Sequence, residues 1–327
     1  MVVNIFFWLV CLAITIGAGW LFFNKALRAP KLWVKIVGGL VAAGACLGFA
    51  SWVLIGGYGI LKYYFPGVGP APELVVAGTP EQTARGEYLT NLSCIGCHGA
   101  VDDQGNLTGN QPFSGGWNFG ASKGVGFAGL IAAENLTPGG KLANYSDGEL
   151  FRAMRYSVDQ NGHLLSAMSL MPYSQLSDAD IEAIIAYLRS LAPVENNLPT
   201  GDKLNYLGML AAGAGFYGNP KAASETVPAL PEGVTAEYGK YVATYGDCRV
   251  CHGPDMTGAK ATLVLPTVPN PRPLVKNMSE GQFAEMMRTG IRPNGIAFTK
   301  EMPWENAARM TDEDLAALYL YLTTPLK

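Results

Sequence analysis

Two short motifs constrain this chain more than any other feature of its sequence. A Cys-x-x-Cys-His pattern occurs twice, at Cys94, Cys97 and His98 and again at Cys248, Cys251 and His252. At this spacing, two thiols on one helical turn can add to the two vinyl groups of a haem, while the next imidazole ligates its iron. Each copy therefore predicts one covalently attached haem c, with His98 and His252 as the proximal ligands.

Other uses of paired cysteines fit this sequence less well. In structural zinc sites two Cys-x-x-Cys pairs usually lie about 15 to 20 residues apart, whereas 150 residues separate Cys97 from Cys248. A thioredoxin-like redox pair would need a strand-helix-strand context, which neither copy has. The two remaining cysteines, Cys11 and Cys46, lie in apolar runs and are interpreted as small buried hydrophobic residues.

Histidine is too scarce to supply every axial ligand. The chain has three histidines, and two of them belong to the motifs, so His163 is the one spare imidazole. At least one haem iron must therefore take another sixth ligand, for which Met is the usual residue. In the second half of the chain, Met302 is expected to fill this role.

The two halves of the chain repeat one another well beyond the motifs. The offset between matching residues is 153 or 154 near the cysteines and 133 or 134 further on. The first half thus carries about 21 extra residues, mostly in the Gly-rich segment 105–130. The matching pairs include Gly86 and Gly239, Tyr88 and Tyr241, Arg155 and Arg288, Ser177 and Thr311, and Tyr187 and Tyr321.

The repeat also separates two candidate axial ligands in the first half. Met168 keeps the offset of 134 to Met302, whereas Met171, which like Met302 precedes a proline, would need 131. We favour Met168, because packing of the helix that follows sets the register. Met171 stays open as the alternative, and His163 is a third option.

Each half ends in a sequence that predicts a strong amphipathic helix. Ser177 is expected to cap a helix over 177–191, and Thr311 a helix over 311–323, each with acidic residues in its first turn. The apolar face of the first helix should pack against a helix that carries Gly86, where the missing side chain allows close approach to Tyr187. Gly239 and Tyr321 should repeat this contact.

The N-terminal part predicts a transmembrane helical hairpin. Residues 2–23 and 36–60 carry no charge, and each run is long enough to cross the roughly 30 Å hydrocarbon core. The first run lacks the basic leader and the cleavage site of a signal peptide. The loop between the runs is basic, so the positive-inside rule places it in the cytoplasm and everything after Phe65 outside. Its cations are Lys25, Arg28, Lys31 and Lys35.

Composition agrees with a membrane-attached chain that has an acidic outer part. Of the 327 residues, 49% are hydrophobic and 15% are charged, which is too apolar for a wholly soluble protein. Residues 1–65 hold five of the 23 basic residues and none of the 26 acidic ones, so the remainder has a net charge of about −8. This charge excludes nucleic acid as a partner and favours solubility and basic docking partners.

These features predict a mainly α-helical protein with five segments. We expect a transmembrane hairpin over 1–65, a Pro/Gly-rich linker over 66–81, a first domain over 82–192, a linker over 193–235 and a second domain over 236–327. A short helix is expected at 204–212 inside the second linker.

With these residues in place, both domains resemble class I c-type cytochromes. The resemblance rests on Gly-x-Tyr before Cys-x-x-Cys-His, then Met-Pro-aromatic before Ser/Thr-Asp-x-Asp and a terminal Tyr-Leu helix. The segment that begins with Asn135-Leu-Thr-Pro-Gly is similar to cytochrome subunits of bacterial membrane-bound dehydrogenases. The two-haem, N-terminally anchored layout instead resembles the dihaem subunit of one class of bacterial terminal oxidases. The resemblance implies haem c, assembled outside the bacterial cytoplasmic membrane, and electron transfer.

The sequence therefore predicts a membrane-anchored dihaem cytochrome c that relays single electrons on the periplasmic side. It would serve as a subunit of a respiratory or photosynthetic complex, with other membrane subunits, a soluble electron carrier and membrane lipid as partners, and with no catalytic activity of its own. The alternatives are the cytochrome subunit of a periplasmic dehydrogenase and a dihaem peroxidase. Arg155 and Arg288 are expected to pair with haem propionates.

Overall fold

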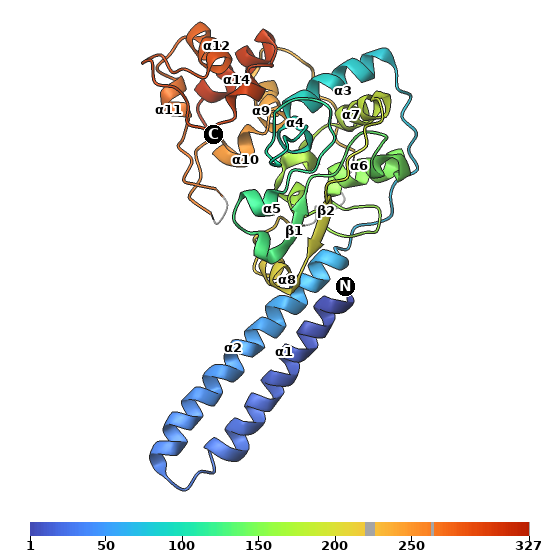
Figure 1. The fold of residues 1–327 in the computed structure, drawn as a ribbon. Helices are drawn as coiled ribbons and strands as arrows, with labels where there is room; N and C mark the ends of the chain where they lie inside the picture. The colour runs from blue at the N-terminus through green and yellow to red at the C-terminus, as the bar shows by residue number, and fades with distance from the viewer. Residues whose placement is uncertain (220–225, 263–264, 327) are drawn as a thin grey trace.

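The computed structural model describes residues 1–219, 226–262 and 265–326 and shows a long helical hairpin that projects from a mainly helical head (Figure 1). The hairpin consists of α1 (Val2–Leu21), which ends in the π-helical turn η1 (Phe22–Ala26), and α2 (Leu32–Tyr64). Both helices are long and apolar enough to cross a membrane, and few of the residues in these apolar stretches are buried. The two apolar helices expected from the sequence are confirmed.

The first domain of the head surrounds the first motif. Its helices are α3 (Pro80–Leu92), α4 (Ile95–His98), α5 (Phe119–Ser122), α6 (Asp147–Tyr156) and α7 (Asp178–Ser190). Short 3-10 turns lie between them, namely η2 (Gly126–Ala128), η3 (Lys141–Asn144), η4 (Met168–Leu170) and η5 (Pro172–Gln175).

The second domain repeats this plan with fewer elements. Its helices are α9 (Ala236–Tyr245), α10 (Cys248–His252), α11 (Arg272–Val275), α12 (Glu280–Thr289), α13 (Trp304–Ala307) and α14 (Asp312–Thr323). The predicted caps of the terminal helices are confirmed, because Ser177 Oγ accepts the N–H of Asp180 at 3.1 Å and Thr311 Oγ1 accepts that of Asp314 at 3.1 Å.

A pair of glycines lets the first and last helices of each domain touch. A Cβ added to Gly86 would overlap the carbonyl oxygen of Ala183 and lie 2.8 Å from Cβ of Tyr187. A Cβ added to Gly239 would overlap the carbonyl oxygen of Ala317 in the same way. The close α3–α7 and α9–α14 crossings predicted from the repeat are therefore confirmed.

The two domains are joined by reciprocal tyrosine contacts. Tyr88 of α3 donates a short hydrogen bond to Asp314 at the start of α14 and accepts the N–H of Thr311 at 3.0 Å. Tyr241 of α9 donates to Asp180 at the start of α7 at 2.6 Å and accepts the N–H of Ser177. Each domain therefore lends its Gly-x-Tyr tyrosine to the helix cap of the other.

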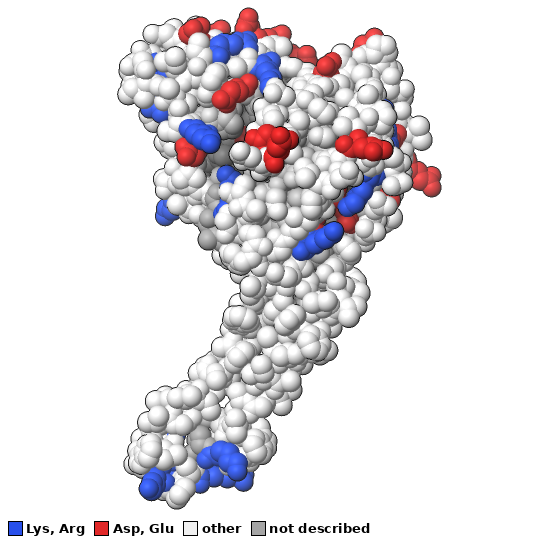
Figure 2. Space-filling model, viewed as in Figure 1, with Lys and Arg blue, Asp and Glu red and all other residues white. Residues whose placement is uncertain are grey.

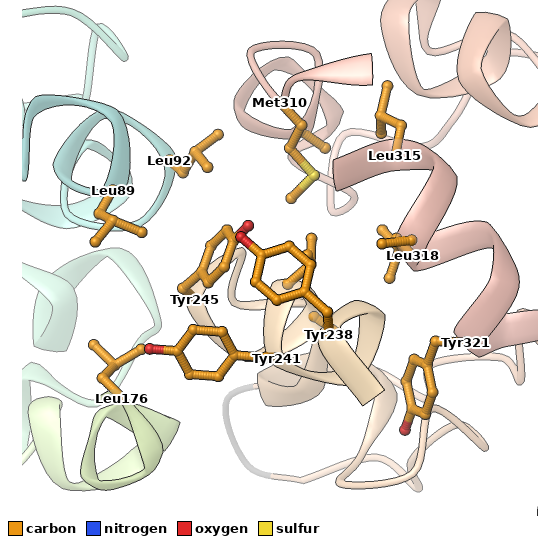
Figure 3. Packing of buried hydrophobic residues seen from close by; sticks show 14 of the residues in the cluster. Leu89, Leu92, Leu176, Tyr238, Tyr241, Tyr245, Met310, Leu315, Leu318 and Tyr321 are labelled. Carbon is orange, nitrogen blue, oxygen red and sulfur yellow. The ribbon is translucent and has the colours of Figure 1, made fainter. Parts of the chain in front are cut away.

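One apolar core runs through this junction. Leu89 and Leu92 of α3 belong to the same buried cluster as Leu315 and Leu318 of α14. Figure 3 shows Tyr241 reaching from α9 toward Leu176 of the first domain. The two domains are thus packed as one body rather than hung on a flexible connection.

Part of the segment expected to link the domains has a fixed place beneath the head. It carries β2 (Gly201–Leu204), which pairs antiparallel with β1 (Gly129–Ala132), and α8 (Tyr206–Gly213), close to the short helix expected at 204–212. α8 packs against the outer end of α2 (Figure 1). Part of this segment therefore serves as the joint between the head and the hairpin.

Candidate haem sites

The first motif is presented by a single helical turn. Cys94 stands immediately before α4, which contains Cys97 and His98, and the backbone N–H of His98 donates to the carbonyl of Cys94 at 2.8 Å. Burial raises the pKa of Cys94 and of Cys97 to about 12, so both thiols are protonated at neutral pH. Two thiols and an imidazole therefore emerge from the same turn.

The His98 ring is oriented by a backbone carbonyl. Its Nδ1 lies 2.8 Å from the carbonyl oxygen of Glu134, to which Nδ1–H donates, and this leaves Nε2 as the free lone pair. Burial lowers the pKa of His98, which favours the neutral imidazole that a metal requires. Fixing the far nitrogen in this way holds a ligating imidazole in one tautomer and one orientation.

The second motif repeats this arrangement. All five of its residues form α10, and Nδ1 of His252 lies 3.0 Å from the carbonyl oxygen of Pro269. Burial lowers the pKa of His252 as well. Sequence reasoning missed the roles of Glu134 and Pro269, because they act through backbone carbonyls that lie 36 and 17 residues beyond their histidines.

A largely apolar cavity of about 320 Å³ lies next to the first motif. Cys94, Cys97 and His98 line it, and Met168 and Met171 both line it as well. The geometry therefore keeps both methionine candidates. The rest of the wall includes Trp117, Phe119, Ile131, Leu136, Leu142, Leu150, Leu165, Tyr173, Leu176, Ile184 and Leu188.

The same cavity reaches the second motif. Val250 and Cys251 are among its lining residues, so the second attachment motif lies beside the cavity of the first. Asp247 lies between them, where burial raises its pKa to about 7 and Tyr173 donates to it at 3.1 Å. Its Oδ1 is buried without a hydrogen-bond partner in the described part of the chain.

Met302 and a buried arginine, Arg272, both lie in the second domain. Met302 is half-buried against the shared core just before α13. Arg272 follows Pro269 by three residues and is buried, with its Nε donating to the carbonyl of Asp255 at 2.9 Å. Its Nη2 is buried and has no partner among the described residues, so it can serve an acceptor that the chain itself does not supply.

Arg155 and Arg288 have matching partners inside the protein. Arg155 is buried and donates to the carbonyls of Ser174 and Leu176 and to the carboxylate of Asp178. Arg288 donates to the carbonyl of Ala308 and, at 2.7 Å, to Asp312. Both arginines thus tie one helix of their domain to the start of the terminal helix. Their pairing with haem propionates stays a prediction.

His163 lies away from the cavity lining, at the outer end of the hairpin. Its ring stacks on that of Tyr63 with centroids 5.9 Å apart and meets the edge of Tyr64 at 5.1 Å. Its Nδ1 is 3.9 Å from the Asp159 carboxylate. This position favours Met168 or Met171 over His163 as the sixth ligand of the first site.

The donor set fits a covalently held haem. Across residues 1–219, 226–262 and 265–326, no three His, Cys, Asp or Glu side chains gather to hold a metal ion by themselves. Each motif instead offers two thiols, one oriented neutral imidazole and, in the first site, a cavity with an apolar wall and a thioether. These features match what a haem needs for attachment, ligation and burial.

Comparison with known proteins gives one family. The family model for cytochrome c matches residues 83–192 and 236–325, together more than half of the chain. The chain is also similar to a protein named "Diheme cytochrome c-type" from Cereibacter sphaeroides, with 25% identity over 77% of this chain and 88% of the relative.

Two dehydrogenase subunits are similar over a smaller share of their own length. One belongs to the nicotinate dehydrogenase of Pseudomonas putida, with 25% identity over 71% of this chain and 18% of the relative. The other is "Fructose dehydrogenase cytochrome subunit" from Gluconobacter japonicus, with 30% identity over 36% of this chain and 26% of the relative. The chain therefore spans about a quarter or less of these two relatives.

Proposed function

The chain belongs to the cytochrome c family, and from this premise we propose that it is a membrane-anchored dihaem cytochrome that relays single electrons between its two domains. A bound haem would supply one-electron chemistry at its iron. Cys94, Cys97, Cys248 and Cys251 would attach the two groups, His98 and His252 would ligate them, and Met168 and Met302 would close the opposite sides.

One observation carries the relay. Residues of the second motif line the cavity that contains the first motif, so the two groups would lie next to each other inside one packed body. The reciprocal contacts of Tyr88 and Tyr241 hold that arrangement in place. An electron entering at one domain would therefore cross to the other without any movement of the chain.

The apolar hairpin supports anchoring of the protein in the cytoplasmic membrane. With the basic loop in the cytoplasm, the head would lie on the periplasmic side, where it would meet other subunits of its complex and a soluble carrier. The names of the relatives support a dehydrogenase as the electron source. The alternative is that the chain is a subunit of a respiratory or photosynthetic complex. Electron transfer between the two domains would be the same in either assembly.

The dihaem peroxidase is the second function to be tested. A peroxidase must leave one iron open to peroxide, whereas each domain here offers a methionine at matching positions. We expect the purified protein to be fully reduced by a one-electron donor and to show no spectral change and no turnover with hydrogen peroxide. Peroxide turnover in that assay would exclude the relay as its sole role. The polypeptides that co-purify in mild detergent identify the complex.

The axial ligand of the first site has its own expected result. Replacing Met168 with Ala should convert one of the two haems from low-spin to high-spin, because the iron loses its thioether ligand. Met171→Ala is the matched control, since both methionines line the same cavity, and should leave both haems low-spin. Electron paramagnetic resonance of the oxidised protein distinguishes high-spin from low-spin haem. A high-spin haem in Met171→Ala, with both haems low-spin in Met168→Ala, would assign the ligand to Met171.

A further inference from the structure

The joint between the head and the hairpin carries exposed apolar side chains. Phe127, Leu207 and Phe216, here called the neck surface, are 63%, 43% and 53% exposed. Asn205 links the first two of these residues, since its Nδ2 donates to the carbonyl of Phe127 at 2.8 Å and its Oδ1 accepts the N–H of Leu207 at 2.9 Å. The sequence from 204 to 219 contains no charged residue. Figure 2 shows an uncharged surface from the joint down along the hairpin on the face that is drawn, with Lys or Arg side chains at the lower edge of the head above it.

The height of this surface follows from the length of α2. About 20 helical residues cross the hydrocarbon core, so a span that starts after Lys35, the last cation of the loop, reaches the outer boundary near Ile55. Trp52 lies just before this level and Tyr58 just after it, and both side chains are exposed. Aromatic residues of this kind concentrate at membrane interfaces.

α8 is fixed to α2 at this same level. The hydroxyl of Tyr206 donates to the carbonyl of Trp52 at 3.1 Å. A Cβ on Gly59 would overlap the carbonyl oxygen of Met209, so the two helix backbones are in direct contact. Lys62 then holds the end of this segment, since its Nζ donates to the carbonyl of Tyr217 at 2.9 Å. The neck surface is therefore held at the boundary of the bilayer.

We propose that the neck surface is a membrane-binding surface that inserts its three apolar side chains into the outer leaflet beside the hairpin. This inference rests on the proposed membrane anchoring of α1 and α2. Lipid is the expected occupant because the surface is continuous with the exposed apolar face of the hairpin and lies at its aromatic level.

The contact would also set the position of the first haem site. α8 directly follows β2, and β2 pairs with β1, whose Ile131 and Ala132 line the cavity. Lipid contact at the neck surface would therefore hold that site at a constant height and tilt above the membrane. A two-helix stalk alone would leave the head and the hairpin free to tilt together in the membrane.

Photo-crosslinking in the full-length protein tests this inference. The probe p-benzoylphenylalanine replaces Phe216 in protein reconstituted into nanodiscs of phosphatidylethanolamine and phosphatidylglycerol. Two control positions receive the same probe. Leu40 lies in the first third of α2, inside the membrane span that starts after Lys35, and is 70% exposed, and Ile296 lies in the second domain and is 54% exposed. After illumination, mass spectrometry detects the lipid adducts.

Lipid adducts at 216 and at 40, with none at 296, are the expected result. Adducts at 40 without any at 216 would overturn the membrane contact while leaving the anchor intact. An absence of adducts at 40 would overturn the anchor itself, and the inference with it. The illumination is then repeated in native membranes. There, an adduct between residue 216 and a polypeptide would overturn the lipid contact and show that the neck surface binds a protein.

Discussion

Replacing Cys248 and Cys251 together with Ala is expected to halve the haem content, from two covalently bound groups per chain to one. Without thiols in the second domain no thioether bond can form there, while the first motif keeps its two cysteines and the oriented ring of His98. The pyridine haemochrome ratio and the intact mass of the purified chain measure this change.

The reciprocal variant and an outside cysteine complete the comparison. Cys94 and Cys97 changed to Ala should likewise leave one group, now in the second domain. Cys46 lies in the hairpin, away from both motifs, and its replacement with Ala should leave the haem content at two per chain. A haem content of two in either double variant would show that attachment does not depend on these motifs.

A single methyl group at Gly239 is expected to destabilise the second domain strongly. The added Cβ would overlap the carbonyl oxygen of Ala317 and lie 2.5 Å from its carbonyl carbon, so α9 and α14 must move apart. Overpacking of this kind costs up to about 3 kcal/mol. For a domain of this size, a loss of about 3 kcal/mol lowers Tm by roughly 12 to 24 °C.

Gly281 provides the matched control for this substitution. It lies in α12 of the same domain, and a Cβ placed there would meet nothing within 4 Å. Gly281→Ala should therefore leave Tm unchanged or raise it slightly, since Ala favours a helix over Gly. Thermal unfolding followed by Soret circular dichroism reports both variants. Equal melting temperatures for the two would refute the close crossing.

Local signals made much of the fold predictable. The caps Ser177 and Thr311 act on residues three positions away, and Gly86 and Gly239 reveal the helix crossings through a spacing that the repeat preserves. The long uncharged runs likewise predict two apolar helices by length alone. In each of these cases the physical cause lies within a short stretch of sequence.

The contacts that the sequence did not reveal are those between distant segments. The repeat identifies Tyr88 and Tyr241 only as matching positions, and nothing near them in the sequence shows that each bonds to the opposite domain. The extra residues of the first domain are recognised from the sequence only as a Gly-rich segment; they include α5 and lead into β1, which pairs with a strand after the domain. Backbone carbonyls such as that of Glu134 carry no residue-type signal at all.

The exchange of tyrosines makes the head resemble a dimer contained within one chain. In a two-fold symmetric dimer, the same patch on each protomer must carry both halves of the contact. The first domain carries Tyr88 and Asp180, and the second carries Tyr241 and Asp314, so each unit has a surface that matches its own copy. Because the connection raises the effective concentration of one unit near the other to about millimolar, an interface too weak to join two separate chains is enough to keep the pair together.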